Sequence, residues 1–169
     1  MKVLETPRLE LRWLTPEDAP FILELLNDPL FIRFVGDKGA RTVEDARAYL
    51  INGPIASYAQ HGFGLFLVSL KADGTPLGMC GLLKRPVLED VDIGFAYMTC
   101  HGGKGYGTEA AAAILNYGLT VLGLGRIVAI TAVDNTASGH VLEKIGLRFE
   151  RMIQLPGYKG DSRLYTPAG

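Results

Sequence analysis

Four glycines fall within six residues, in the run Gly102-Gly103-Lys104-Gly105-Tyr106-Gly107. A strand-like apolar segment precedes this run, and an Ala-rich helical pattern follows it. Glycines allow positive φ and a close approach of the backbone, so successive N–H groups can converge on an anion, and a helix N-terminus adds partial positive charge. The pattern is typical of a phosphate-binding loop, to which Lys104 can add a full charge. A tight strand-to-helix turn, the alternative, needs only one or two glycines.

The residues after the glycines limit the kind of phosphate ligand. A Walker loop ends in Gly-Lys-Ser/Thr, whereas here Gly105 follows Lys104. A dinucleotide fingerprint needs Gly-x-Gly-x-x-Gly, and Thr108 stands where the last glycine would be. Asp134, at the end of the next predicted strand, is placed where an acid could bind a ribose. A dinucleotide-binding protein of the NAD type therefore stays open as an alternative.

The same stretch resembles a known family. Gly105 and Gly107 occupy the glycine positions of the acetyl-CoA loop, Gln/Arg-x-x-Gly-x-Gly/Ala, of GNAT-fold acyltransferases. Residues 103–110, GKGYGTEA, are similar to the GKGYATEA stretch of the branch that acetylates ribosomal proteins, the Rim type. Three further segments resemble this branch in the same order, namely residues 6–19, 92–95 and 134–146. The resemblance covers nearly the whole chain and implies an acetyl-CoA-dependent N-acetyltransferase.

Two departures from the family's pattern bear on the site. Gly102 stands where the family usually has Gln or Arg, so the backbone and Lys104 must carry more of the pyrophosphate. Leu142 stands four residues before Gly146, where many GNAT enzymes place a tyrosine acid. This chain therefore has no tyrosine acid at the position where many GNAT enzymes place one.

The resemblance also implies how acetyl-CoA is held. The pantetheine arm would lie alongside the strand that ends at Tyr97 and Met98, whose backbone N–H groups would polarise the thioester carbonyl. Asn135 would bind the same arm, although an Asn at this place can also simply cap the next helix. The pyrophosphate would rest on backbone N–H groups of Gly103, Lys104, Gly105, Tyr106, Gly107 and Thr108.

Two side chains are candidates for the chemistry. Asp92 matches the family's acidic position and would relay the amine's proton through water, or it is an ordinary solvent-facing strand residue. Ser138, in the first turn of a predicted helix, would face the thiolate, because the helix dipole and the hydroxyl both favour negative charge there. Glu89 and Asp90 join Asp92 in an acidic cluster that could attract a cationic amine, unless they form a solvated loop. With no convincing covalent nucleophile, we expect direct attack in a ternary complex.

The elements that must position these residues follow from periodicity and turn signals. We predict one domain over residues 1–169, of α/β class, with a central, mixed, mostly antiparallel sheet flanked by helices in the order βααβββαβαββ. Asn27-Asp28-Pro29 is expected to end the first helix. Strands are expected at 9–13, 63–70, 76–83, 91–98, 126–133, 149–153 and 163–166, and helices at 16–26, from 42, at 108–122 and at 136–145.

Composition excludes several classes of protein. The chain has 169 residues, 48% of them hydrophobic and 21% charged, which excludes a disordered chain, a collagen-like repeat and a coiled coil. With 17 Lys+Arg against 18 Asp+Glu, it lacks the basic excess of a nucleic-acid binder. Two cysteines, no signal-like N-terminus and no apolar run of ~18 residues predict a cytoplasmic protein without a membrane partner. The His and Cys residues show no metal-ligand spacing, so no metal is expected.

We therefore predict an N-acetyltransferase that moves an acetyl group from acetyl-CoA to a primary amine. The acceptor would be a protein or peptide N-terminus, or a small amine or polyamine. We expect the loops at 31–41 and 156–162 to bind it, and the sequence of such loops does not indicate which acceptor they bind. A non-catalytic CoA-binding sensor or interaction domain is the rival, followed by the NAD-type protein. Strand edges near the C-terminus are compatible with a monomer or a homodimer.

Overall fold

The computed structural model describes residues 1–158 and 160–168, and in these ranges eight strands form one sheet in the order β1-β2-β3-β4-β5-β6-β8-β7. The strands are β1 (Lys2–Glu5), β2 (Leu9–Trp13), β3 (Leu65–Leu70), β4 (Pro76–Leu83), β5 (Val91–Tyr97), β6 (Ile127–Ala132), β7 (Leu147–Gln154) and β8 (Asp161–Pro167). Among their pairings, β5 with β6 is parallel and the others are antiparallel. The predicted mixed, mostly antiparallel sheet is confirmed.

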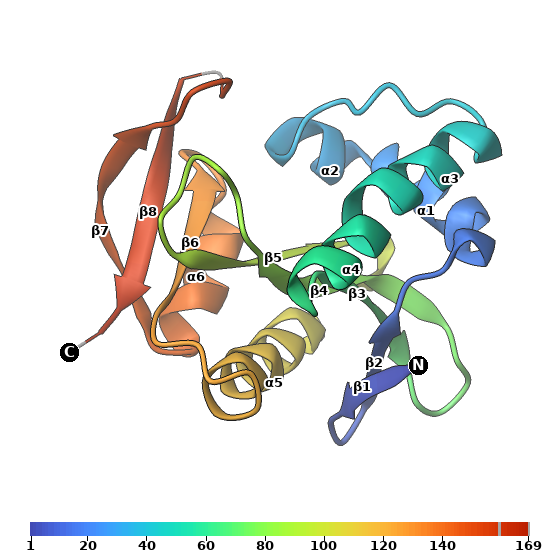
Figure 1. The fold of residues 1–169 in the computed structure, drawn as a ribbon, viewed down its shortest axis with the longest axis horizontal. Coiled ribbons are helices and arrows are strands. Elements are labelled where there is room, and N and C mark those ends of the chain that lie inside the picture. Colours follow the sequence, from blue (N-terminus) through green and yellow to red (C-terminus); the bar gives the residue numbers. More distant parts are fainter. Residues whose placement is uncertain (159, 169) are drawn as a thin grey trace.

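Helices cover both faces of the sheet, as Figure 1 shows, with α5 on one side and α1, α2 and α3 on the other. The α helices are α1 (Ala19–Leu26), α2 (Pro29–Phe34), α3 (Val43–Leu50), α4 (Ala56–His61), α5 (Tyr106–Thr120) and α6 (Thr136–Lys144). Shorter turns of helix are η1 (Pro16–Asp18), η2 (Ile51–Ile55) and η3 (Thr99–His101).

Two hydrophobic cores follow from these layers. Apolar residues of β2 to β6 pack against α5 and α6 in the first core, which includes Phe66, Ile93 and Ile114. Leu67 and Met79 face the opposite way and pack against α1 and α3 in the second. Alternate residues of each strand therefore supply opposite cores, as expected where helices cover both faces.

Strands β5 and β6 separate soon after they meet. Their parallel pairing comprises Val91 with Ile127 and Asp92 with Val128. From Ala129 onward, β6 pairs with β8 instead. The remaining length of β5, from Ile93 to Tyr97, thus borders a wedge whose apex lies at Asp92. Figure 1 shows β6 turning away from β5 toward the β7–β8 pair.

Three local predictions differ from the structure by more than the bounds of an element. Lys2–Glu5 forms a strand that sequence reasoning missed, because four residues are too few to show a period of two. Residues 27–29 do end α1, but Asp28 then accepts a hydrogen bond from the Leu30 N–H at 3.1 Å and caps a new helix, α2. The expected loop at 31–41 is therefore partly helical.

The third difference concerns the helix predicted from residue 42. It continues through a π-helical turn, η2, into α4, although Pro54 lies inside it. Proline has no N–H to donate and clashes with the preceding turn, and the wider π turn accommodates both effects. The consequence is that Asn52 and Gly53 lie exposed on the bend, beside the hollows described below.

Candidate active site

The free edge of β5 is the first element of the site. The N–H of Met98 donates to the Leu77 carbonyl at 2.9 Å, and Tyr97 stands opposite Gly78 in the register. In an antiparallel ladder, neighbouring residues turn their backbone groups to opposite edges. The N–H and C=O groups of Tyr97 and of Phe95 therefore point toward the wedge. The Met98 N–H, predicted to polarise a thioester, is already used within the sheet, so that part of the prediction is wrong.

The glycine loop lies beyond the open end of this edge. Gly103 and Gly105 have φ of +76° and +81°, left-handed values that only glycine adopts readily, and Gly105 caps the N-terminus of α5. Residues 102–105 are exposed, and the first turn of α5 is half-buried. The loop thus presents successive backbone N–H groups and a helix N-terminus to solvent, an arrangement suited to an anion.

An arginine from the N-terminal strands fixes this loop from outside. Arg8 Nη1 donates to the Lys104 carbonyl at 2.9 Å, and Arg8 Nε donates to Glu109 Oε1 at 2.7 Å. Its guanidinium also lies 4.6 Å from the centre of the Tyr106 ring. Thr6 completes the contact by donating its hydroxyl proton to Glu109 Oε2. Because Arg8 binds the Lys104 carbonyl, this carbonyl does not occupy the neighbouring N–H groups, which remain free for a ligand.

Arg8 and Glu109 were missed as site residues, although both lie in segments that carry the family resemblance. An acidic residue in the first turn of α5 is favourable for the helix dipole alone, so its type and place do not indicate a pairing with Arg8. Burial acts to raise the pKa of Glu109, but the hydrogen bonds from Thr6 and Arg8 outweigh it and lower the pKa below its usual value. Glu109 is therefore ionised at neutral pH and holds Arg8 in place.

The side chain of Tyr97 points away from the wedge into the first core. A Cβ atom on Gly107 would lie 3.4 Å from its ring, and a Cβ on Gly78 only 2.9 Å from it. Gly78 therefore makes room for the backbone of β5 and for the ring, whereas the contact at Gly107 is an ordinary van der Waals distance. Burial raises the pKa of Tyr97 well above its ordinary value, and its hydroxyl finds no hydrogen-bond partner among the described residues. Tyr97 thus offers the site its backbone, while its ring supports α5.

Asp92 lies at the apex of the wedge, on the face opposite α5. Its side chain is 1% exposed and accepts hydrogen bonds from Arg85 Nε at 3.0 and 3.2 Å. The alternative of a solvent-facing residue is therefore wrong. Burial raises the pKa of Asp92 to about 6, even though the Arg85 charge acts to lower it. Arg85 Nη1 also donates to the Tyr158 hydroxyl at 2.6 Å, which joins the β4–β5 loop to the β7–β8 turn.

The predicted acidic cluster does not act as one negative patch. Asp92 is paired with Arg85, and Asp90 accepts a hydrogen bond from Arg126 Nε at 3.2 Å. Glu89 is exposed. Because two of the three acids face their own arginines, the cluster carries less net negative charge than its sequence indicates, and its attraction for a cationic amine stays a prediction. Nothing in the local sequence around Arg85 or Tyr158 indicates that Arg85 binds both Asp92 and Tyr158.

The start of α6 brings the remaining two candidates to the carboxyl end of β6. The side-chain oxygen of Asn135 accepts from the Ser138 N–H at 3.2 Å and caps the helix, so the capping role is confirmed. Ser138 is half-buried, and its hydroxyl makes no hydrogen bond to the residues described. Leu142, at the family's tyrosine position, is buried in the first core.

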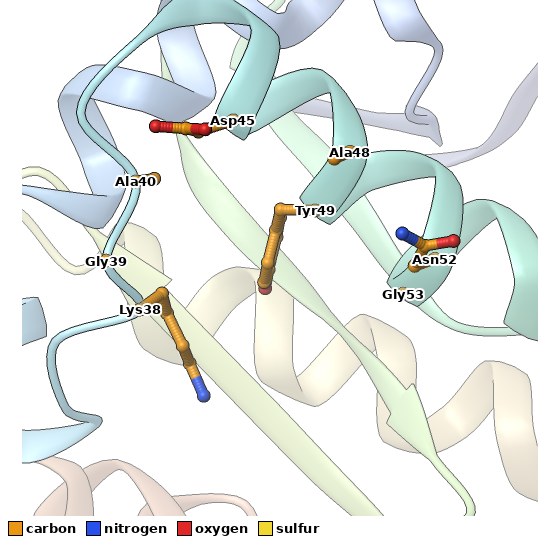
Figure 2. A pocket seen from close by; sticks show the side chains of 8 residues that line it. All are labelled: Lys38, Gly39, Ala40, Asp45, Ala48, Tyr49, Asn52 and Gly53. Carbon is orange, nitrogen blue, oxygen red and sulfur yellow. The ribbon is translucent and has the colours of Figure 1, made fainter.

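Two adjoining hollows open on the face of the sheet opposite α5, and one of them is bordered by Arg85. One, of about 420 Å³, lies between α3 and the segment that precedes it, and Figure 2 shows Lys38 and Tyr49 extending in the same direction from its two sides. The other, of about 300 Å³, is bordered by Lys84, Arg85 and Pro86. Tyr49, Asn52 and Gly53 line both, so the two form one groove that runs from Lys38 to Arg85.

No helix in residues 1–158 and 160–168 is long and apolar enough to span a bilayer. Within the same ranges, no three His, Cys, Asp or Glu side chains gather as they would around a metal ion. Cys80 is buried, Cys100 is exposed, and both are free.

Comparison with known proteins agrees with this geometry. Residues 8–148 match the family model described as "Acetyltransferase (GNAT) domain". The uncharacterized N-acetyltransferase YnaD of Bacillus subtilis (strain 168) is 31% identical over 147 residues, which cover 87% of this chain and 83% of YnaD. A GNAT-family acetyltransferase from Bacillus anthracis superposes with a TM-score of 0.80 at 27% identity, covering 99% of this chain and 98% of that one.

A solved structure with bound cofactor has the same fold. It is RimL, a ribosomal L7/L12 alpha-N-protein acetyltransferase in complex with coenzyme A, with a TM-score of 0.83 at 19% identity over 99% of this chain and 98% of that one. The family match spans most of the chain, including the glycine loop, the free edge of β5 and the start of α6. This chain belongs to the GNAT family of N-acetyltransferases.

Proposed function

We propose that the protein binds acetyl-CoA along β5 and the glycine loop and transfers the acetyl group directly to a primary amine. The observation that carries the proposal is the wedge: a free strand edge ends at a left-handed glycine loop and a helix N-terminus, with a buried carboxylate at the apex. The pyrophosphate would rest on N–H groups from Gly103 to Thr108. The pantetheine arm would pair with the free backbone groups of Tyr97 and Phe95, and Asn135 would flank it from α6.

The reaction needs a neutral amine, a polarised carbonyl and a proton for the leaving thiolate. An N–H on the free edge of β5 would donate to the thioester oxygen while the amine nitrogen attacks the carbonyl carbon. The new C–N bond forms as the C–S bond breaks. Asp92 would take the amine's proton through water, and the Ser138 hydroxyl would stabilise the thiolate, helped by the α6 dipole. Water would then carry one proton from Asp92 to the thiolate, which leaves as the free thiol and restores the carboxylate. No covalent enzyme intermediate is required.

The environment of Asp92 suits a proton acceptor. With a pKa of about 6, the carboxyl is ionised at pH 7 to 8 and yet more basic than an ordinary aspartate. We expect the rate to fall as the pH drops through about 6, because the carboxylate becomes protonated. Asp92→Asn should lose roughly 10²–10⁴-fold in kcat and, with it, this acidic limb of the pH profile.

The test combines binding with turnover. Titration calorimetry with acetyl-CoA is followed by a coenzyme A release assay over a panel of amines, for the wild type, Asp92→Asn and Ser138→Ala. Both variants should bind acetyl-CoA as the wild type does and turn over more slowly. Binding without turnover on any amine would favour the CoA-sensor alternative. Tighter binding of NADH than of acetyl-CoA would refute the proposal in favour of a dinucleotide site.

A further inference from the structure

The groove between Lys38 and Arg85 lies on the acceptor side of the wedge, if acetyl-CoA binds as proposed above. Arg85 borders the groove with a side chain that is 30% exposed, and it connects the groove to Asp92 at the wedge apex through their ion pair. Asp92 and Ala96 of β5, and Met98 just after its end, share one face of the sheet, where Ala96 and Met98 pack against the core under α1 and α3. The groove therefore opens above the same face as the Asp92 carboxylate.

The charges in this groove are mainly positive. Lys38, Lys84 and Arg85 border it, and Asp45 is the acid on its wall. Asp45 already accepts hydrogen bonds from the Arg41 and Thr42 N–H groups at 2.9 and 3.1 Å, as part of the cap of α3. Lys84 Nζ is turned to the Leu88 carbonyl at 2.6 Å. Arg85 and Lys38 thus remain to meet a ligand, and a polycation would find no free carboxylate on these walls.

Arg85 is positioned as an anion-binding side chain. Its Nε is held by Asp92, and Nη1 gives one proton to Tyr158, while Nη2 makes no hydrogen bond within the described part of the chain. The Tyr49 hydroxyl, on the wall common to both hollows, is likewise without a partner among those residues. Burial raises the pKa of Tyr49, and the Arg85 charge acts against this rise, so the Tyr49 phenol is neutral at neutral pH. Arg85 and Tyr49 therefore border the same hollow, each with a hydrogen-bond donor that no described residue uses.

We propose that the acceptor carries a carboxylate beside its amine, and that Arg85 and Tyr49 bind this carboxylate in the groove. Such an acceptor has one anionic and one cationic end, and these complement the Arg85–Asp92 ion pair at the wedge apex. Its carboxylate would lie on Arg85, and its ammonium would lie toward Asp92, which takes the proton. Free α-amino acids and peptides with an acidic residue next to the N-terminus share this chemistry. Polyamines lack it.

The proposal is tested with matched acceptors in which a carboxylate is replaced by its amide. One arm compares a free amino acid with its carboxamide, and the other compares peptides with Glu or Gln after the N-terminal residue. A charged hydrogen-bond acceptor should give roughly 10- to 100-fold higher kcat/KM than its amide in at least one arm. The arm that shows the preference identifies the source of the carboxylate. A ratio near one in both arms, or a preference for spermidine, overturns the proposal.

Variants assign the preference to the groove. Arg85→Gln should reduce the acid-to-amide ratio to near one, while Arg126→Gln, which breaks the other arginine–aspartate pair near the start of β5, should leave it unchanged. Because Arg85→Gln leaves the buried Asp92 without its counter-ion and can impair folding, Tyr49→Phe serves as a second variant that keeps the ion pair. It should reduce the ratio severalfold.

A binding measurement separates this inference from the proposed function. Titration with the N-acetylated acidic peptide and its amide analogue needs no turnover, and the acidic form should bind the wild type more tightly. If acetyl-CoA binds and neutral amines are acetylated without any such preference, the groove inference alone fails. If acetyl-CoA does not bind, the proposed function fails, and the peptide titration still decides whether Arg85 binds a carboxylate.

Discussion

Replacing Gly105 by alanine should weaken acetyl-CoA binding, whereas the same change at Gly107 should not. Gly105 has φ of +81°, and a Cβ there would lie 3.3 Å from Arg8 Nη2. A left-handed conformation costs an L-residue roughly 1–2 kcal/mol, partly offset by the lower entropy of the unfolded alanine chain. Gly107 lies inside α5 without a positive φ, and its Cβ would lie 3.4 Å from the Tyr97 ring. There alanine is expected to be tolerated and gains up to about 1 kcal/mol of helix propensity.

These magnitudes give measurable differences. If the strain is relieved only when the loop leaves its binding conformation, Kd for acetyl-CoA rises roughly 5- to 30-fold in Gly105→Ala. If the strain at residue 105 persists in the free protein, the melting temperature of Gly105→Ala falls by about 2–4 °C for each kcal/mol of lost stability in a chain of this size. Calorimetric titration and thermal melts of both variants distinguish the two cases. Unchanged affinity and stability in Gly105→Ala, or a loss confined to Gly107→Ala, would refute the reasoning.

Three further changes test the surroundings of the loop. Tyr97→Phe removes a buried hydroxyl without a described partner and should leave the melting temperature unchanged or raise it; a loss of more than about 1 kcal/mol in urea unfolding would mean that the hydroxyl is hydrogen-bonded. Asn135→Ala should cost about 1 kcal/mol by removing the cap of α6, while Asn135→Asp should retain it, as urea unfolding can measure. Glu109→Gln should lower the melting temperature at pH 7. Because the folded pKa of Glu109 is depressed, its contribution is present above the ordinary value of 4.5 and is lost at lower pH, so wild type and variant should converge there; a constant gap would contradict the assignment.

Much of the scaffold could be predicted because it depends on local pattern. The strand Pro76–Leu83 has the predicted bounds, and β5, β6 and α6 agree within one residue at each end, since alternation, glycine turns and helical periodicity are all readable there. The short strand β1 and the helix α2 were missed for local reasons as well. Asp28-Pro29 both ends one helix and begins the next, and the signals for the two are the same.

The site was only partly predictable because its decisive contacts are long-range. The glycine loop could be recognised from its own residues, but which N–H groups of β5 are free depends on the register with β4. The burial of Asp92 depends on Arg85, and the place of Arg85 depends on a turn more than 70 residues away. No spacing rule connects such residues. Their pairing is a property of the folded chain.

The contact of Arg8 and Thr6 with Glu109 joins segments about 100 residues apart, and this has a consequence for the order of folding events. The loop can reach its binding shape only after the N-terminal strands have docked on α5, a contact of high sequence separation that forms slowly compared with local turns. Ligand affinity would then appear late in refolding, after most helical signal has returned. A pulse of acetyl-CoA added at successive refolding times would report directly on the closure of that long-range contact.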